Sequence, residues 1–315
     1  MDFKYFKKLW LFILVSFLLT VSAVLGCSPG QEEHLKKTAE DRVEKGEEGK
    51  LVVKDYADKE MVLEETPQSF VSAMPSNTEV LFALGLDDKV LGVTNFCDYP
   101  PEAGEKDSIG DSYNIDIEKI VELNPDLVLT GEGQEDLSDR LRDMDIPTVV
   151  INPGNFEEIK QSILFIGRIS GNEESAQNIA EEMQHRAEAV ISSAEDIPAE
   201  ERPDVLVLVD PESLYVAGKG TFIDELITMA GGVNIAAESG YFTMSEEKIL
   251  EENPEVIINT FPMREEVLER SSWEVITAVE NEDVYDIDGN LVSRPGPRVV
   301  EGLEKLYGKL HGDNN

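Results

Sequence analysis

The alternation of apolar and polar residues follows the same course twice along this chain. Residues 118–129 read EKIVELNPDLVL and residues 247–258 read EKILEENPEVII, with six of the twelve positions identical and five more exchanged for similar residues. In each copy a polar helical turn stops at Asn-Pro, because a proline disfavours the α conformation in the residue before it. The unbroken apolar run that follows suits a strand covered on both faces, as in a parallel sheet. The repeat therefore predicts two similar α/β lobes with a ligand-binding cleft between them.

The pattern outside the repeat predicts further elements of the first lobe. Ser76 or Asn77 is expected to cap a helix that Gly85 ends. The expected elements are a hairpin within 51–66, a strand, a turn and that helix over 70–86, and strands at 90–93 and 148–151.

Two consecutive helices are predicted after the first lobe, at 156–169 and from 173 to about 193. The second would be about 31 Å long, because each of its roughly 21 residues adds about 1.5 Å, and this length could cross from one lobe to the other. The second lobe is expected to contain strands at 204–210 and 283–287 and helices at 221–229 and 296–310, the last with Pro297 in its first turn.

These elements define the predicted fold, an α/β protein of two similar lobes, each a mostly parallel sheet flanked by helices, joined by a single long inter-lobe helix. The N-terminal lobe covers 51–155, a helical connector covers 156–200 and the C-terminal lobe covers 201–315. Residues 28–50, rich in Glu, Lys and Gly, are predicted to form a flexible tether.

The segment 1–27 differs from the rest of the chain. Lysines precede an apolar run at 9–24, and Leu25-Gly26-Cys27 follows. The run is shorter than the roughly 20 residues of a spanning helix, and its flanks are those of an export signal. The small residue before Cys27 resembles the processing site of bacterial lipoproteins, where the new N-terminal cysteine carries lipid; an uncleaved N-terminal anchor is the alternative. In both cases the folded part is expected outside the cytoplasmic membrane and attached to its outer face.

The charge of the chain is strongly negative, with 27 Lys and Arg against 65 Asp and Glu and a formal net charge of −38. Such a charge disfavours nucleic acid as a partner and makes the chain repel itself. Salt near molar concentration screens that repulsion, so we hypothesise a salt-rich habitat. The chain has two cysteines, Cys27 and Cys97. A lipid on Cys27 would leave Cys97 without a partner for a disulfide, and Cys97 is expected to be a small buried thiol rather than a metal ligand.

Six segments of the chain, taken in order, carry a resemblance to known proteins. They are PSNTEVLFALG at 75–85, DYPPEA at 98–103, NIDIEKIVELNPDLVL at 114–129, YVAGKGTFIDELITMAGG at 215–232, SEEKILEENPEVII at 245–258 and RPGPRVVEGLEKLYGKLH at 294–311. Together they resemble the substrate-binding lipoproteins of ABC importers for cobalamin, ferric siderophores and haem, over about residues 52–311. The resemblance implies a bilobed receptor with a rigid helix between the lobes. It also implies that ligand binds between the lobes and passes to a permease dimer with its ATPase.

The resemblance gives Glu118 and Glu247 a role in docking. In the family a glutamate on each lobe docks onto arginines of the dimeric permease, and these two residues stand at the matching positions. Two exposed carboxylates, one on each lobe, suit a partner with two basic sockets. The alternative is that both only favour their helix N-termini electrostatically.

The ligand-binding residues are expected in loops at the strand ends of both lobes. Aromatic walls offer large rigid surfaces to a flat macrocycle, and Arg294 offers a fork of donors. The alternatives are core packing for the aromatic residues and helix capping for Ser76 and Asn77. The predicted set is Ser76, Asn77, Phe96, Tyr99, Tyr113, Asn114, Tyr215, Tyr241, Phe242 and Arg294.

Three ligands fit these residues to different degrees. A ferric siderophore is often anionic and needs several cations, of which Arg294 and Arg298 are candidates. Haem needs an axial Tyr or His, for which Tyr99 or Tyr113 is available. A corrinoid needs aromatic and amide contacts without strong cationic demand, and it fits best, although Gly131 and Tyr241 stand where cobalamin receptors have tryptophans.

No enzyme class is favoured by the sequence. It has no nucleophile elbow of the G-x-S-x-G type and no Ser–His or Cys–His arrangement that can be singled out. We predict a monomeric binding protein with no metal site or cofactor of its own, whose ligand is a metal chelate. A secreted hydrolase that uses paired carboxylates is a distant alternative.

Overall fold

A computed structural model of the 315-residue chain describes residues 38–46, 49–111 and 114–312. The predicted export signal with Cys27, the tether up to residue 37, and Tyr113 lie outside the described residues. Within the described ranges, no helix combines the length and the apolar character needed to cross a membrane.

The first lobe is built on a sheet of five parallel strands in the order β6-β5-β4-β7-β8. All four residues of β7 are buried, as expected for a strand covered on both faces. The strands are β4 (Phe70–Ser72), β5 (Val90–Val93), β6 (Asp107–Ser108), β7 (Leu127–Thr130) and β8 (Thr148–Val150).

The helices of the first lobe are α3 (Pro75–Ala83), α4 (Ile117–Leu123) and α5 (Glu135–Asp143). The prediction that Ser76 or Asn77 caps α3 is wrong, because the N-cap is Met74 and makes no side-chain hydrogen bond. Proline fits the first helical position, so the helix starts at Pro75 and places the two polar residues inside its first turn. Gly85 follows the helix with a φ of +72°, as predicted.

A small antiparallel sheet precedes this lobe. The predicted hairpin is confirmed by β2 (Leu51–Lys54) and β3 (Glu60–Leu63), and β1 (Val43–Lys45) adds a third strand next to β2. The prediction of a tether up to residue 50 is wrong from Thr38 onward, because helix α2 (Ala39–Arg42) and β1 are folded. A capping box between Thr38 and Asp41 starts α2, and this signal was hidden within the charged run.

The second lobe is built on a mixed sheet in the order β12-β10-β9-β13-β14, with β11 also paired to β9. The pairs among β9, β13 and β14 are parallel, whereas β10 and β12 are antiparallel additions at one edge. The strands are β9 (Asp204–Asp210), β10 (Tyr215–Ala217), β11 (Val233–Asn234), β12 (Tyr241–Thr243), β13 (Val256–Asn259) and β14 (Val284–Asp286).

The helices of the second lobe include the predicted one after Thr221, which caps α8 through its side chain. The closing helix α13 begins at Val299 rather than at 296, so Pro297 precedes it instead of lying in its first turn. The helices are α8 (Phe222–Met229), α9 (Glu246–Glu252), α10 (Arg264–Leu268), α11 (Thr277–Glu280), α12 (Gly289–Ser293) and α13 (Val299–His311).

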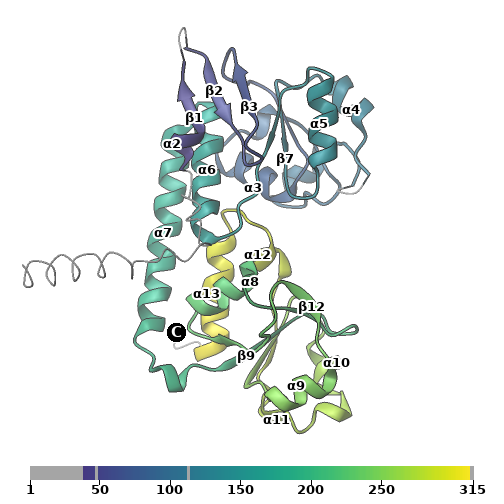
Figure 1. Ribbon diagram of the computed structural model, residues 1–315, viewed down its shortest axis with the longest axis vertical. Helices are drawn as coiled ribbons and strands as arrows, with labels where there is room; N and C mark the ends of the chain where they lie inside the picture. Colours follow the sequence, from purple (N-terminus) through teal and green to yellow (C-terminus); the bar gives the residue numbers. More distant parts are fainter. Residues whose placement is uncertain (1–37, 47–48, 112–113, 313–315) are drawn as a thin grey trace, which may run out of the picture. The chain divides into compact units, whose positions relative to one another are not determined.

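Two long helices, α6 (Phe156–Ser170) and α7 (Glu173–Glu195), join the lobes. Helix α6 contacts α2 and α3 of the first lobe, whereas α7 contacts α6 and then α13 and α8 of the second (Figure 1). The two helices approach closely at Gly167, where an added Cβ would lie 2.3 Å from that of Ala176. The predicted single spanning helix is therefore α7, with α6 packed against its first half.

The two copies of the repeat fold alike. Asn124 and Asn253 end α4 and α9 in the left-handed conformation, with φ, ψ of 47°, 56° and 48°, 63°. The strands that follow, β7 and β13, lie inside different sheets and pair on both sides with parallel neighbours. The prediction of two separate α/β lobes with parallel cores is thus confirmed.

Candidate functional site

A cavity of about 730 Å³ lies in the second lobe where β9, β13 and β14 end. Loops at the carboxyl ends of parallel strands are where open α/β sheets bind ligands, because the chain there is free of sheet packing. The volume falls within the range of roughly 300–1,000 Å³ that small-molecule sites occupy. The lining residues are Val209, Tyr215, Ile223, Tyr241, Thr260, Phe261, Pro262, Asp286, Ile287, Asp288, Gly289, Asn290 and Ser293.

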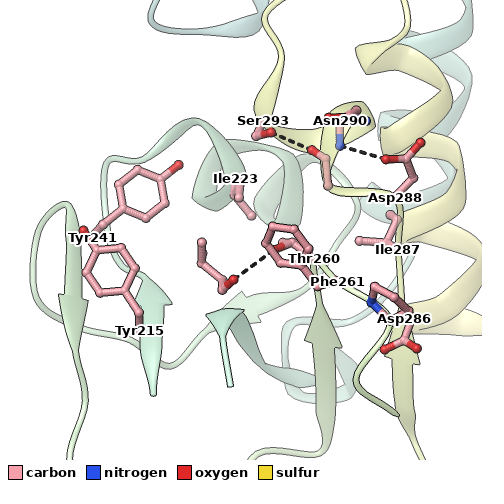
Figure 2. A pocket seen from close by; sticks show the side chains of 13 residues that line it. Tyr215, Ile223, Tyr241, Thr260, Phe261, Asp286, Ile287, Asp288, Asn290 and Ser293 are labelled. Carbon is pink, nitrogen blue, oxygen red and sulfur yellow. Dashed lines mark hydrogen bonds between the residues drawn. The ribbon is translucent and has the colours of Figure 1, made fainter. Parts of the chain in front are cut away.

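Three aromatic rings line this cavity, and Figure 2 shows Phe261 beside Thr260, apart from the two tyrosines. Tyr215 and Tyr241 stand on the neighbouring strands β10 and β12, and their rings are stacked with centroids 6.1 Å apart and 22° between their planes. Phe261, on the loop after β13, is 58% exposed, so its ring is open to contact by a ligand. Figure 2 shows the two tyrosines side by side across the cavity from Asp286 and Asp288.

The opposite side of the cavity is polar and held by short hydrogen bonds. Asp286 accepts from Asn259 Nδ2 at 2.9 Å, and Asp288 caps α12 by accepting from the backbone N–H of Asn290 at 3.0 Å. Ser293 donates to the carbonyl of Gly289 at 2.6 Å (Figure 2). This side therefore offers carboxylate and hydroxyl groups in fixed positions.

The hydroxyl of Tyr241 is also influenced electrostatically by a residue of the first lobe. Burial raises the pKa of its hydroxyl, and the Glu132 carboxylate and Tyr215 raise it further. Glu132 lies in the loop after β7 of the first lobe, so a charge from that lobe acts on a residue that lines the cavity. The Tyr241 phenol stays neutral and can donate a hydrogen bond at physiological pH.

The predicted aromatic residues of the second lobe have different surroundings. Tyr215 and Tyr241 line the cavity, as expected for ligand contacts. Tyr241 begins an edge strand, so its predicted loop position is wrong. Phe242 points to the other face of that strand because successive side chains alternate, and it packs against the core of the second lobe.

The predicted residues of the first lobe do not reach the cavity. Ser76 and Asn77 are buried, and the Asn77 amide donates to the carbonyl of Thr130 at 3.0 Å. Asn114 is exposed and bonds the Asp111 carboxylate through its backbone N–H at 2.7 Å. Their ligand contacts, like that of Tyr113, stay predictions.

Arg294 reaches from the second lobe to the first. Its Nη1 lies 2.6 Å from Asp98 Oδ1 and 3.2 Å from Glu79 Oε1, and its Nη2 donates to the carbonyl of Phe96 at 3.3 Å. Its fork of donors therefore joins the lobes, whereas the sequence predicted that it would face a ligand. Phe96 itself is 47% exposed.

A second arginine completes this contact. Arg298 binds the Glu79 carboxylate with Nε at 2.9 Å and Nη2 at 2.6 Å, and its guanidinium covers the ring of Tyr99 at 3.7 Å. The side chain of Glu79 is only 2% exposed, so the pair is shielded from water. Tyr99 lies beside a second cavity of about 480 Å³ that both lobes line.

Several lining residues were missed by sequence reasoning. Thr260 and Phe261 directly follow β13, the strand of the second repeat copy, and Asp286 to Asn290 end and follow β14. The rule that ligands meet the carboxyl ends of strands could have pointed to them. Their types gave no signal, because acidic residues are abundant throughout this chain.

Cys97 is a buried thiol, as predicted. It is 3% exposed, accepts a hydrogen bond from Thr78 Oγ1 at 3.1 Å and lies 3.3 Å from Thr94 Oγ1. Burial raises the pKa of this thiol despite these bonds. Among the described residues, no three His, Cys, Asp or Glu side chains are grouped as metal ligands.

Glu118 and Glu247 are exposed and occupy the first turns of α4 and α9, at equivalent positions of the two repeat copies. Each lobe therefore presents one carboxylate from the same local structure.

Comparison with known proteins places the chain in a family. Residues 71–291 match the family described as periplasmic binding protein. The chain belongs to this family. The resemblance to substrate-binding proteins of ABC importers for cobalamin, siderophores and haem is confirmed, and the chain is a binding protein rather than an enzyme.

Three relatives illustrate the match of this periplasmic binding protein. The "uncharacterized ABC transporter substrate-binding lipoprotein YvrC" of Bacillus subtilis is 33% identical, covering 96% of this chain and 97% of the relative. A vitamin B12-binding protein of Vibrio cholerae is 27% identical over 76% of this chain and 87% of its own. A solved structure of a possible iron-binding periplasmic protein from Staphylococcus epidermidis has a TM-score of 0.70 and 28% identity, covering 78% of this chain and all of that one.

Proposed function

We propose that this protein captures a corrinoid in the region between its lobes and delivers it to the permease dimer of an ABC importer, driven by its ATPase. The observation that carries the proposal is the aromatic cavity in which Tyr215, Tyr241 and Phe261 face polar groups that include Asn290 and Ser293. A flat, amide-bearing macrocycle can stack on such rings while its amides exchange hydrogen bonds with the polar side.

The alternative ligands, a ferric siderophore and haem, have weaker support. Arg294 and Arg298, the cations that an anionic siderophore would use, are engaged with Glu79 and Asp98. For haem, His311 bonds the carbonyl of Ala230 at 2.8 Å and Tyr99 is covered by Arg298. Tyr215 or Tyr241 could still serve as an axial ligand, so haem remains the second candidate.

Titration of the purified protein with cyanocobalamin, haem and ferric siderophores tests this function. Saturable quenching of tyrosine and tryptophan fluorescence by the corrinoid at micromolar concentration or below is the expected result. Substituting Tyr215 and Tyr241 together by leucine keeps apolar volume but removes the stacked rings. We expect that variant to bind the corrinoid about ten- to a hundredfold more weakly, since one stacking contact is worth about 0.5–1.5 kcal/mol. If haem binds and the corrinoid does not, the assignment of a corrinoid as the ligand is wrong and haem takes its place.

We also propose that Glu118 and Glu247 dock the two lobes onto basic residues of the permease. Reversing both charges (E118R and E247R) should abolish uptake by cells while leaving the affinity for ligand in solution unchanged. The matched control carries E195R and E200R, which change the net charge equally at exposed positions near the end of the helical connector. A loss of ligand affinity in the first variant, or an equal loss of uptake in the control, contradicts the docking role.

Attachment to the outer face of the cytoplasmic membrane through lipid on Cys27 is a further part of the proposal. The protein is expected to act there as a monomer. Cells that carry the Cys27→Ser variant should lose the lipid-modified form in mass spectrometry of the membrane fraction. An unmodified Cys27 in the wild-type protein contradicts the anchor, and light scattering of the detergent-solubilised protein tests the monomer.

A further inference from the structure

We infer that the cavity selects its ligand by charge, binding neutral or cationic chelates and rejecting anionic ones, through the carboxylates of Asp286 and Asp288. The inference rests on the proposed function, because it concerns the ligand of the same site. It names a class of chelate and two residues that determine specificity.

The first observation is the charge of the cavity wall. Two of the described residues that line it are carboxylates, Asp286 and Asp288, and none is a lysine or an arginine. Both carboxylates hold fixed positions, because Asp286 accepts from Asn259 and from the backbone N–H of Met263, and Asp288 caps α12. A ligand in the cavity therefore lies near two carboxylates whose orientation is fixed by these hydrogen bonds.

The second observation concerns two arginines that follow the cavity lining in the sequence. Arg294 and Arg298 stand at the start of the closing segment, only a few residues beyond the cavity lining. Both are paired with carboxylates of the first lobe, Arg294 with Glu79 and Asp98, and Arg298 with Glu79. Two guanidinium groups thus face two carboxylates of the first lobe, and Arg298 also interacts electrostatically with Asp288. With Asp288 counted, this group holds three carboxylates and two guanidinium groups, so its balance stays negative.

Lys219 is another cation near the tyrosine side of the cavity. Its backbone bonds Glu238 and Gly240 next to β12, but its side chain is not part of the cavity wall. Glu238, whose carbonyl accepts from the backbone N–H of Lys219, carries the opposite charge in the neighbouring loop. The single charge of Lys219 therefore does not make this side of the cavity positive.

The third observation brings in the first lobe. Glu132 is exposed in the loop after β7, and its charge contributes to raising the pKa of Tyr241, which lines the cavity. Glu132 is not part of the cavity wall, but its carboxylate adds negative charge on the side of the first lobe and supports the same sign of selection.

The expected size of the effect follows from Coulomb's law. One negative charge about 6 Å from a carboxylate, at an effective dielectric constant of about 40, lowers an affinity about tenfold. With more than one carboxylate in range, we expect the discrimination against an anion to be at least tenfold at low salt and to shrink as salt is added.

The test uses two corrinoids that differ in one group. The full chain in detergent is titrated with cyanocobalamin and with the derivative in which hydrolysis has turned one peripheral amide into a carboxylate. The expected result is a Kd at least tenfold higher for the carboxylate derivative. The readout is the ratio of the two Kd values. A substitution that weakens the binding of both corrinoids equally therefore leaves this ratio unchanged.

The variant D286N with D288N identifies the residues. Asparagine keeps an oxygen that can accept the hydrogen bonds now made to Asp286, and it still caps a helix, so α12 keeps its start. The ratio should fall to about threefold or less in this variant and stay at its original value in the control E280Q, an exposed acid on α11 away from the cavity. A ratio near one in the wild-type protein, or a ratio that the variant leaves unchanged, overturns the inference while the corrinoid function stands.

A second pair of chelates separates the two proposals. If neither corrinoid binds, the corrinoid function fails, and the charge inference is tested with a ferric trihydroxamate that carries a free amine and with its N-succinyl derivative. Preference for the amine supports charge selection on its own, and equal binding overturns it. If no member of either pair binds, both proposals fall.

Discussion

Single buried carboxylates join segments that lie far apart in this chain. Asp55 is 1% exposed and accepts from the backbone N–H groups of Ala57 and Lys59 and, across 95 residues, from that of Val150. Its other bond is to Arg142 Nη2, at 2.5 Å. One side chain therefore fixes the hairpin turn and ties it to the sheet of the first lobe.

We predict that Asp55→Asn destabilises the protein by about 3–5 kcal/mol, because Arg142 loses its buried charge partner and keeps only the exposed Asp139. The midpoint of urea unfolding followed by circular dichroism measures this loss. Asp139→Asn is the matched control, since Asp139 pairs with the same arginine at 3.2 Å but is 63% exposed. It should cost less than about 1 kcal/mol. Equal losses in the two variants would show that burial does not decide the strength of these pairs.

Asp98 gives the protein a dependence on acid. Partial burial alone would raise its pKa, but the hydrogen bond and charge of Arg294, with help from Arg298, hold it below its ordinary value of 3.8. A carboxylate with a lowered pKa contributes stability that is complete above its unfolded pKa and is lost as the pH falls through its folded pKa. We therefore predict that Asp98→Asn flattens the loss of unfolding free energy below about pH 4, measured by urea titrations from pH 6 to pH 2. An unchanged slope in that window contradicts the role of the Arg294 pair.

At the scale of elements, the repeat unit shows how one local design serves both lobes. A helix, an asparagine in the left-handed conformation and a proline deliver the chain into a buried parallel strand in each copy. The surroundings of the two asparagines differ. Asn253 exchanges two hydrogen bonds of 2.9 Å with Thr277, through Nδ2 and Oδ1, and this ties α9 to α11.

We predict that Asn124→Gly is close to neutral, because glycine adopts the left-handed conformation readily. Asn253→Gly should cost about 1–3 kcal/mol, since it also deletes the two hydrogen bonds to Thr277. Valine at either position should destabilise by at least 1–2 kcal/mol through backbone strain. Thermal unfolding of the four variants gives the comparison, and equal effects of glycine at both sites would refute the role of Thr277.

For the whole folded part, the connections between the lobes matter more than either lobe alone. Helix α7 packs against helices of both lobes, Glu79 bridges two arginines of the second lobe, and Glu225 accepts from the backbone N–H of Phe156 at 2.8 Å. Several independent contacts across the same gap favour small movements of the lobes over a wide hinge swing.

The net charge of −38 also acts on the protein as a whole. Repulsion among exposed carboxylates opposes the folded state and is screened by salt. We predict that the Tm rises by several degrees when potassium chloride increases from 0.1 to 2 M, measured by calorimetry. Chloride is preferred to sulfate, because sulfate strengthens apolar burial in any protein. A Tm that stays constant or falls speaks against the salt-rich habitat.

Much of the architecture could be predicted from sequence because it depends on local patterns. A window of one or two dozen residues is enough to recognise the Asn-Pro stop, the apolar runs of β7 and β13 and the periodic pattern of helix α7. The short strands β10 and β12 and the folded start at Thr38 were missed, since strands of only three residues and a helix of four are too short to show a periodic pattern.

The binding site divides in the same way. The sequence by itself determined the two-lobed family, the stacked pair Tyr215 and Tyr241 as candidates, and the equivalence of Glu118 and Glu247. Only the tertiary structure decided that Arg294 binds the first lobe, that Phe242 faces a core, and that Asp286 and Asp288 line the same cavity as the tyrosines. The direction of a side chain and the partner of a charge depend on which strand ends meet in space, and no local pattern encodes that meeting.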